Sequence, residues 1–173
     1  MKITITILLA CLSLTIYGQE YTTCSTLDSL IWKKVNEYRT TEDAIAKAYG
    51  VPNTITEFGL GEMREYCYKV TKMNAQLSFE DMRHSTYEEL TPTANGECLY
   101  KHRRTSTGEP STLDLTCDTT LEYLANKVVT GWINSWTHRT VIGWRADNVS
   151  TVTTLFSFIE RGIQMDVTYH AKE

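Results

Sequence analysis

The chain has 173 residues, of which 42% are hydrophobic and 22% are charged, with 9 glycines and only 3 prolines. This composition is typical of a globular protein, and the length suits one domain, so collagen-like and largely disordered proteins are excluded. The 17 basic and 21 acidic residues give a net charge of −4. A general nucleic-acid binder needs a basic surface to displace the counterions of phosphates, so no nucleic-acid partner is expected.

The first eighteen residues have the pattern of a secretory signal peptide. Met1-Lys2 provides a positive start, Ile3–Ile16 is largely apolar, and Tyr17-Gly18 ends in a small residue. The apolar stretch is too short for a stable membrane span. We therefore expect residues 1–18 to be removed and residues 19–173 to form a single secreted or periplasmic domain.

A second interpretation of the same segment stays open. Leu8-Leu9-Ala10-Cys11 resembles a bacterial lipobox, which would anchor the protein through a lipid on Cys11, although few residues precede that cysteine. No later apolar run reaches the roughly 18 residues of a spanning helix, so no transmembrane segment is expected.

Export also determines how the remaining cysteines are interpreted. An even number of cysteines in an exported protein predicts disulfides, here two of them. Three pairings are possible, and the sequence does not choose between them. There is no Cys-x-x-Cys spacing, which argues against a zinc ribbon or a thioredoxin-type site. The four candidates are Cys24, Cys67, Cys98 and Cys117.

Three segments have the apolar spacing of amphipathic helices. We expect Ser25 or Thr26 to cap the first helix, and Thr119 to open the third in a capping box with Glu122. The first apolar stripe comprises Leu27, Leu30, Ile31, Val35 and Tyr38. The second comprises Met63, Tyr66, Cys67, Val70, Met73 and Leu77. The third comprises Leu121, Leu124, Ala125, Val128 and Trp132.

Strand patterns occur later in the chain. Glu97–Arg103 follows a turn at Asn95-Gly96, and Thr151–His170 is rich in β-branched and aromatic residues, with Arg161-Gly162 placed to close a hairpin. The second arm, Ile163–Tyr169, alternates apolar and polar residues, which predicts one side against a core and the other in water. Helices followed by an antiparallel pair predict an α+β fold.

The four histidines differ in their surroundings. His84 continues the second apolar stripe if that helix extends so far, and such a histidine is more often packed in a core than functional. His138 follows two tryptophans and precedes an arginine, which suits a pocket wall as well as ordinary packing. We expect His102 to be solvated and His170, near the C-terminus, to be incidental.

Four short motifs together resemble the CAP superfamily, whose domain is also called the SCP domain and which includes cysteine-rich secretory, antigen 5 and pathogenesis-related proteins. Asn36-Glu37-Tyr38-Arg39 resembles the family's Asn-x-x-Arg element, and His84 is similar to its first histidine. Gly96-Glu97-Cys98-Leu99 resembles the family's Gly-Glu-Asn-Leu strand opening. Trp132-x-x-Ser135-x-x-His138-Arg139 resembles the Trp-x-x-Ser-Pro-Gly-His-Arg of its bacterial branch. The motifs follow the family's order over about residues 25 to 171.

The resemblance implies a three-layer α-β-α sandwich with a cleft in which histidines and acidic residues meet. The cleft residues would be His84, His138 and Glu97, with Ser135 where many members have a second glutamate. Cys98 stands in place of the family's asparagine, which would allow a disulfide to hold this strand.

Such a cleft suggests a divalent cation, most simply zinc. Neutral imidazoles are good zinc ligands, so His84 and His138 are the candidate ligands, while Glu97 would orient a metal-bound water. Two protein ligands make an open site of modest affinity, and Ser135 cannot replace a second carboxylate.

Three functions are compatible with these residues. The first is a secreted, non-enzymatic module whose cleft binds a divalent cation and whose surface binds a lipid, cell-envelope or protein ligand. The alternative is a metal-assisted extracellular hydrolase, peptidase-like, in which His84 and His138 hold the metal and Glu97 activates its water. A third is a disulfide-braced interaction protein with inert histidines.

Overall fold

The computed structural model describes residues 21–41, 56–90, 92–105, 118–143, 149–159 and 162–172. The expected signal peptide with Cys11, the cysteine at position 117 and the turn residue Arg161 lie outside these ranges. Within them, no helix combines the length and the apolar character that crossing a membrane requires.

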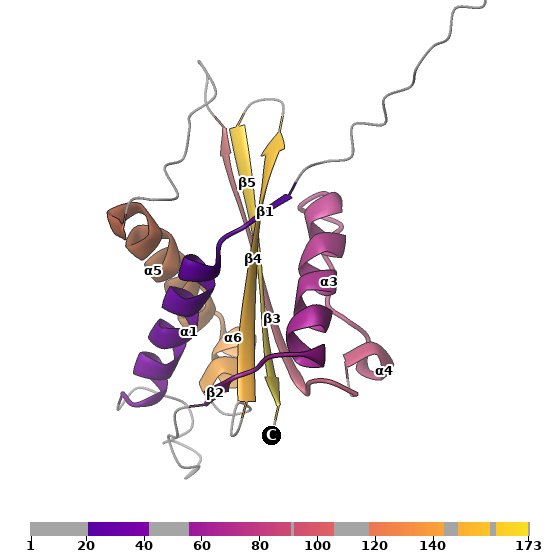
Figure 1. Ribbon diagram of the computed structural model, residues 1–173, viewed down its shortest axis with the longest axis vertical. Helices are drawn as coiled ribbons and strands as arrows, with labels where there is room; N and C mark the ends of the chain where they lie inside the picture. Colours follow the sequence, from indigo (N-terminus) through magenta and orange to yellow (C-terminus); the bar gives the residue numbers. More distant parts are fainter. Residues whose placement is uncertain are drawn as a thin grey trace, which may run out of the picture.

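A twisted sheet runs through the centre of the molecule, with helices on both of its faces (Figure 1). Its strands are ordered β1-β4-β5-β3 and are antiparallel, while the short β2 pairs in parallel with the start of β4. The elements in chain order are β1 (Tyr21–Thr23), α1 (Ser25–Arg39), β2 (Glu57–Phe58), α3 (Glu62–Gln76), α4 (Tyr87–Leu90), β3 (Gly96–Thr105), α5 (Asp118–Asn134), α6 (Trp136–Gly143), β4 (Val149–Ile159) and β5 (Gly162–Lys172).

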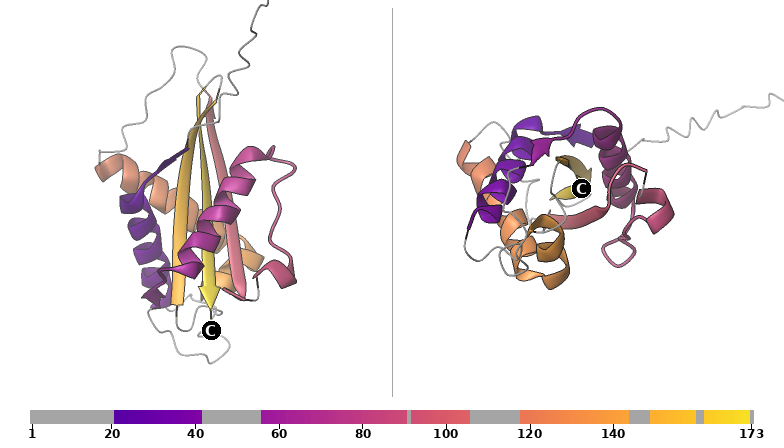
Figure 2. Two further views of the ribbon diagram at one scale, coloured as in Figure 1. Left: turned by 45° about the vertical axis from the view of Figure 1, so that its right-hand side comes forward. Right: turned by 90° about the horizontal axis from the view of Figure 1, so that it is seen from below.

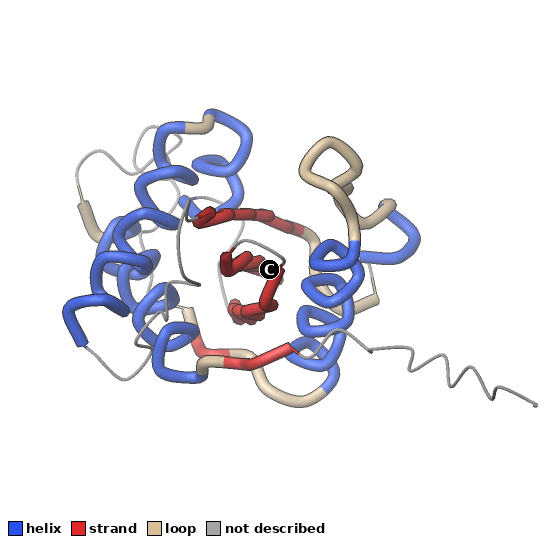
Figure 3. Tube along the Cα trace, turned by 90° about the horizontal axis from the view of Figure 1, so that it is seen from above, coloured by secondary structure: helices blue, strands red, loops and turns tan. Residues whose placement is uncertain are grey.

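The arrangement confirms the expected α+β fold with its α-β-α layers. Helices α1, α5 and α6 cover one face of the sheet and α3 covers the other, as the views along the strands show (Figures 2 and 3). The predicted hairpin is present as β4 and β5, whose register runs from Val149–Lys172 to Ile159–Gly162. The predicted strand after Asn95-Gly96 is β3.

One face of the sheet carries the hydrophobic core. Alternate residues of β3, β4 and β5 pack against the apolar stripes of α1 and α5, and Trp132 at the end of α5 donates a hydrogen bond from Nε1 to the Leu99 carbonyl oxygen at 3.1 Å. The sheet contributes Cys98, Val152, Phe156, Ile163, Met165, Val167, Tyr169 and Ala171 to this core, and the helices contribute Leu27, Ile31, Val35, Leu121, Leu124, Val128 and Trp132 among others.

The other face of the sheet is polar but does not face water, which corrects the expectation for β5. Gln164, Asp166 and His170 are all at most 2% exposed because α3 covers them. Burial is tolerated because the polar groups bind one another. Lys101 Nζ lies 3.2 Å from Asp166 Oδ1 and donates to the carbonyl oxygens of Asn74 and Leu77 at the end of α3, where the helix dipole favours a cation.

The helix boundaries differ from the expected ones in three places. Helix α1 begins directly after Cys24, which makes no side-chain capping bond, so Ser25 and Thr26 already lie inside the helix. Helix α3 ends at Gln76, well before His84. Helix α5 begins at Asp118, one residue before the expected cap. Glu122, the other member of the expected capping box, instead pairs with Lys34 of α1 at 2.8 Å.

Two disulfides were expected, and Cys24, Cys67 and Cys98 are free thiols in the structure, while the cysteine at position 117 lies outside the described ranges. Cys67 lies on the α3 side of the sheet, with its Sγ 3.3 Å from the Thr168 carbonyl oxygen. Cys98 points to the opposite side, with its Sγ 3.6 Å from the His138 carbonyl oxygen. The sheet therefore separates two sulfurs that a disulfide would bring to about 2 Å.

Asp28 joins the two helical layers across the edge of the sheet. Strand β4 pairs at its outer edge with β1 and β2, and Thr154 lies in the gap between them. The buried Asp28 accepts a hydrogen bond from the Thr154 N–H at 2.7 Å, and its Oδ2 lies 3.0 Å from Arg64 of α3. The carboxylate thus satisfies a strand N–H that the neighbouring strands leave unpaired.

Replacing Asp28 should weaken this junction. We expect Asp28→Ala to lower the free energy of unfolding at pH 7 by about 2–3 kcal/mol, because a buried N–H and a guanidinium lose their partner. Glu37→Ala, on the exposed side of α1, should change it by less than about 0.5 kcal/mol. Urea denaturation measures both, and equal effects would contradict this role.

The Asp28→Ala variant should also change how the free energy of unfolding depends on pH in the acidic range. Burial raises the pKa of Asp28 to about 6, although Thr154 and Arg64 favour its charged form. The folded chain therefore binds the Asp28 proton more tightly than the unfolded chain does. The contribution of this proton to the free energy of unfolding falls as the pH rises from about 4 to above 6. This part of the pH dependence should be missing in Asp28→Ala.

Candidate functional site

The structure brings together the three charged or titratable residues of the expected cleft. His84 lies in the segment between α3 and α4, Glu97 is the second residue of β3, and His138 lies on α6. The ring centroids of His84 and His138 are 5.9 Å apart, with the ring planes tilted by 46°. His84 Nδ1 lies 3.0 Å from Glu97 Oε1.

Two buried polar groups fix the segment that carries His84. On one side, the Asn74 side chain of α3 accepts a hydrogen bond from the Arg83 N–H at 2.9 Å and donates one to the Arg83 carbonyl oxygen at 3.0 Å. On the other side, Ser85 donates from its backbone N–H and its hydroxyl to Glu97, at 2.8 and 2.7 Å. His84 is therefore positioned by its neighbours without being part of a helix.

Glu97 is surrounded by donors. Its side chain is 3% exposed, and its two oxygens make four hydrogen bonds: two with Ser85, one with His84 and one with His170. A carboxylate has about four lone-pair sites, so this set fills them. The carboxylate therefore holds protein groups in place, and this position gives it little capacity to activate a water molecule.

His170 is the partner that the sequence analysis missed. It lies directly opposite Glu97 in the β3–β5 register, and its Nε2 is 2.8 Å from Glu97 Oε2. The ring is fully buried and stacks on Tyr66 of α3, with centroids 5.2 Å apart. The alternation of β5 does place His170 on the polar face, but its pairing with Glu97 depends on a strand register that the sequence alone does not give.

The environment drives Glu97 and His170 toward opposite charges. Burial would raise the pKa of Glu97, but the hydrogen bonds from His170, His84 and Ser85 outweigh it and hold that pKa far below its usual range. Burial would lower the pKa of His170, but the Cys67 sulfur and the Glu97 carboxylate raise it to about 9. The two residues thus form a buried ion pair at neutral pH.

His84 and His138 form a histidine pair, and His138 belongs to α6, in a different helical layer from the segment that carries His84. It lines a cavity of about 290 Å³ together with Ser135, Phe79, Met82 and Trp132, among others. Burial, with a smaller contribution from His84, lowers the pKa of His138, so its imidazole is neutral at neutral pH. Of the expected cleft residues, Ser135 and His138 line this cavity, whereas His84 and Glu97 are not part of its lining.

Asn36 and Arg39, which carry the first CAP-like motif, have structural contacts. Asn36 accepts a hydrogen bond through Oδ1 from the Thr56 N–H at 3.1 Å, next to β2. Arg39 is fully buried and donates to the Ile142 carbonyl oxygen of α6 at 3.0 Å. Through these two contacts α1 fixes the strand β2 and the helix that carries His138.

The residues around His84 and His138 fit a divalent cation only as an open site with two protein ligands. Because Glu97 engages Nδ1 of His84, the neutral ring carries its lone pair on Nε2, which is the usual arrangement of a metal-binding histidine with a carboxylate behind it. Across the described ranges, no three or more His, Cys, Asp or Glu side chains converge as ligands.

Comparison of the chain with protein-family models, with curated proteins and with solved structures finds no match. The resemblance to the CAP superfamily therefore stays a prediction.

The Glu97–His170 ion pair predicts that the free energy of unfolding falls at alkaline pH. The folded pKa of His170, about 9, lies above the unfolded value of about 6.5, so its contribution is complete below pH 6.5 and is lost as the pH rises through 9. This shift corresponds to about 3 kcal/mol. We expect His170→Gln to remove that decline in denaturant unfolding between pH 6.5 and 9, while His102→Gln retains it. The same slope in wild type and His170→Gln would contradict the ion pair.

Proposed function

We propose that the chain is a secreted, CAP-like binding module in which His84 and His138 hold a divalent cation, with zinc as the first candidate. The observation that carries the proposal is the proximity of two imidazoles from different layers, one of them held by a carboxylate through Nδ1. A cation there would supply a Lewis-acidic centre beside the cavity that His138 lines.

In this proposal Glu97 does not bind the cation itself but holds His84, which does. It fixes the ring of His84 through Nδ1 and leaves Nε2 free to bind a cation, and His170 keeps the carboxylate ionised. Outer-sphere partners of this kind typically change metal affinity by tenfold to a hundredfold when they are removed. Glu97 is therefore a positioning residue.

The saturation of Glu97 favours binding over hydrolysis. A hydrolase that holds its metal through His84 and His138 would need a base with a free lone pair. All four positions around the Glu97 carboxylate are taken by protein donors. The surface near His138 instead offers apolar area, since Phe79 and Trp136 are 53% and 60% exposed. Exposed aromatic side chains of this kind support a ligand with apolar groups, such as a lipid, cell-envelope or protein surface.

Zinc titration of the metal-free protein by calorimetry tests the proposal. We expect one site of modest affinity in the wild type and none in the His84→Ala, His138→Ala double variant, because both protein ligands are lost. Glu97→Gln should weaken binding about tenfold or more.

The matched control is His102→Ala, which removes a histidine of β3 five residues beyond Glu97 and should bind zinc as the wild type does. Thermal unfolding of each variant without metal shows whether the fold is retained. Equal zinc binding by the wild type and a folded double variant would overturn the proposal. Metal-dependent turnover of peptides or glycans that Glu97→Gln abolishes would instead favour the hydrolase.

A further inference from the structure

A second cavity lies at the other end of the sheet from the histidine pair. It has a volume of about 540 Å³ and lies between α5 and the apolar face of β3, β4 and β5. From β3, His102 lines the cavity. It lies five residues beyond Glu97, a separation of roughly 17 Å along a strand. Volumes of 300–1,000 Å³ are typical of small-molecule sites, so this cavity can hold a ligand independently of the histidine pair.

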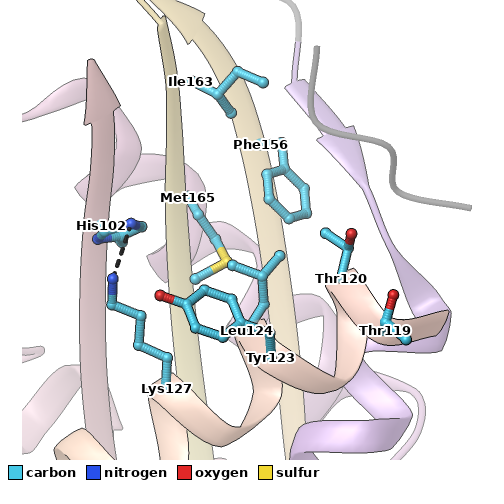
Figure 4. Close-up of a pocket in the computed structure, with 9 residues that line it drawn as sticks. All are labelled: His102, Thr119, Thr120, Tyr123, Leu124, Lys127, Phe156, Ile163 and Met165. Atoms are coloured by element: carbon cyan, nitrogen blue, oxygen red, sulfur yellow. Dashed lines mark hydrogen bonds between the residues drawn. The ribbon is translucent and has the colours of Figure 1, made fainter. Parts of the chain in front are cut away.

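The floor of the cavity is apolar. Phe156 of β4, Met165 of β5 and Leu124 of α5 line it, and all three side chains are at most 4% exposed. In the close-up, Met165 lies at the centre of the lining residues, with Ile163 and Phe156 above it (Figure 4). A ligand that fills this space must therefore present an apolar body.

One side of the cavity carries a positive charge. Lys127 of α5 lies beside His102, with 3.3 Å between Nζ and Nε2, and its Nζ lies 5.7 Å from the centre of the Tyr123 ring (Figure 4). Within the described ranges, no carboxylate lies at ion-pair distance from Lys127. The ammonium group contacts a nitrogen acceptor and a ring face, and neither neutralises its charge.

We propose that this cavity binds an aliphatic carboxylate, with its head group on Lys127 and its chain along Leu124, Phe156 and Met165. An ammonium group at the edge of an apolar floor complements a ligand with one anionic end and an apolar tail. A neutral apolar ligand would leave the lysine charge without a partner, and a small inorganic anion would make no use of the apolar floor.

Calorimetry with a series of straight-chain carboxylates from hexanoate to dodecanoate, below their micelle concentrations, tests the site. Each added methylene group that enters the cavity should tighten binding about threefold to fourfold until the cavity is full. Lys127→Met, which keeps an apolar side chain of similar length, should weaken decanoate binding about tenfold or more. The neutral probe 1-decanol should bind wild type and Lys127→Met equally.

The matched control is Lys33→Met, which removes an exposed lysine of α1 and should leave decanoate binding unchanged. The methyl NMR signal of Met165 reports the location directly, and decanoate should shift it while leaving the signals of Met63 and Met82 in place. Zinc binding should be the same in wild type and Lys127→Met, so this proposal and that for the histidine pair fail separately. An unchanged Met165 signal, or equal decanoate affinity in Lys127→Met and wild type, would overturn the proposal.

Discussion

The contact between Glu97 and His170 determines the geometry of the histidine pair. It joins β3 to β5 beneath α3, and through the same carboxylate it holds His84 and Ser85 in the segment that crosses above it. A buried carboxylate without partners would lose its charge or destabilise the fold, so the donors around Glu97 stabilise its charged form. Among the described hydrogen bonds, the one from His84 Nδ1 to this carboxylate is what fixes the His84 ring.

The buried polar face also explains why the strands pair as they do. Glu97 and Lys101 of β3 lie opposite His170 and Asp166 of β5, so two charge pairs occur on one side of one strand pair. A shift of one residue would move these groups onto the apolar core side, where no partner awaits them. The polar pairs thus specify one register, and the apolar core on the opposite face supplies most of the stabilising burial.

The sequence predicted the elements well because their signals are local. Apolar spacing located α1, α3 and α5, and alternation located β5. The same reasoning failed where an interaction joins distant positions. The polar side of β5 was expected in water because nothing local shows that α3 covers it, and His170 was dismissed although it binds a residue 73 positions away.

The candidate site was predicted in part for the same reason. His84, Glu97 and His138 entered through short motifs, and the structure places them together. Asn74 and Ser85, which hold the His84 segment, carry no motif, and their roles follow from where α3 ends. The cysteines show the same limit, since counting them cannot reveal that the sheet separates Cys67 from Cys98.

Nitrogen NMR of the histidine rings at pH 7 tests the central claim most directly, because it reports which ring nitrogens carry protons. With metal removed, the account predicts that His170 is protonated on both nitrogens and that His84 carries a proton on Nδ1, the nitrogen that faces Glu97. A neutral His170, or a His84 ring protonated on Nε2 alone, would contradict the claim that a buried Glu97–His170 ion pair orients His84 for binding.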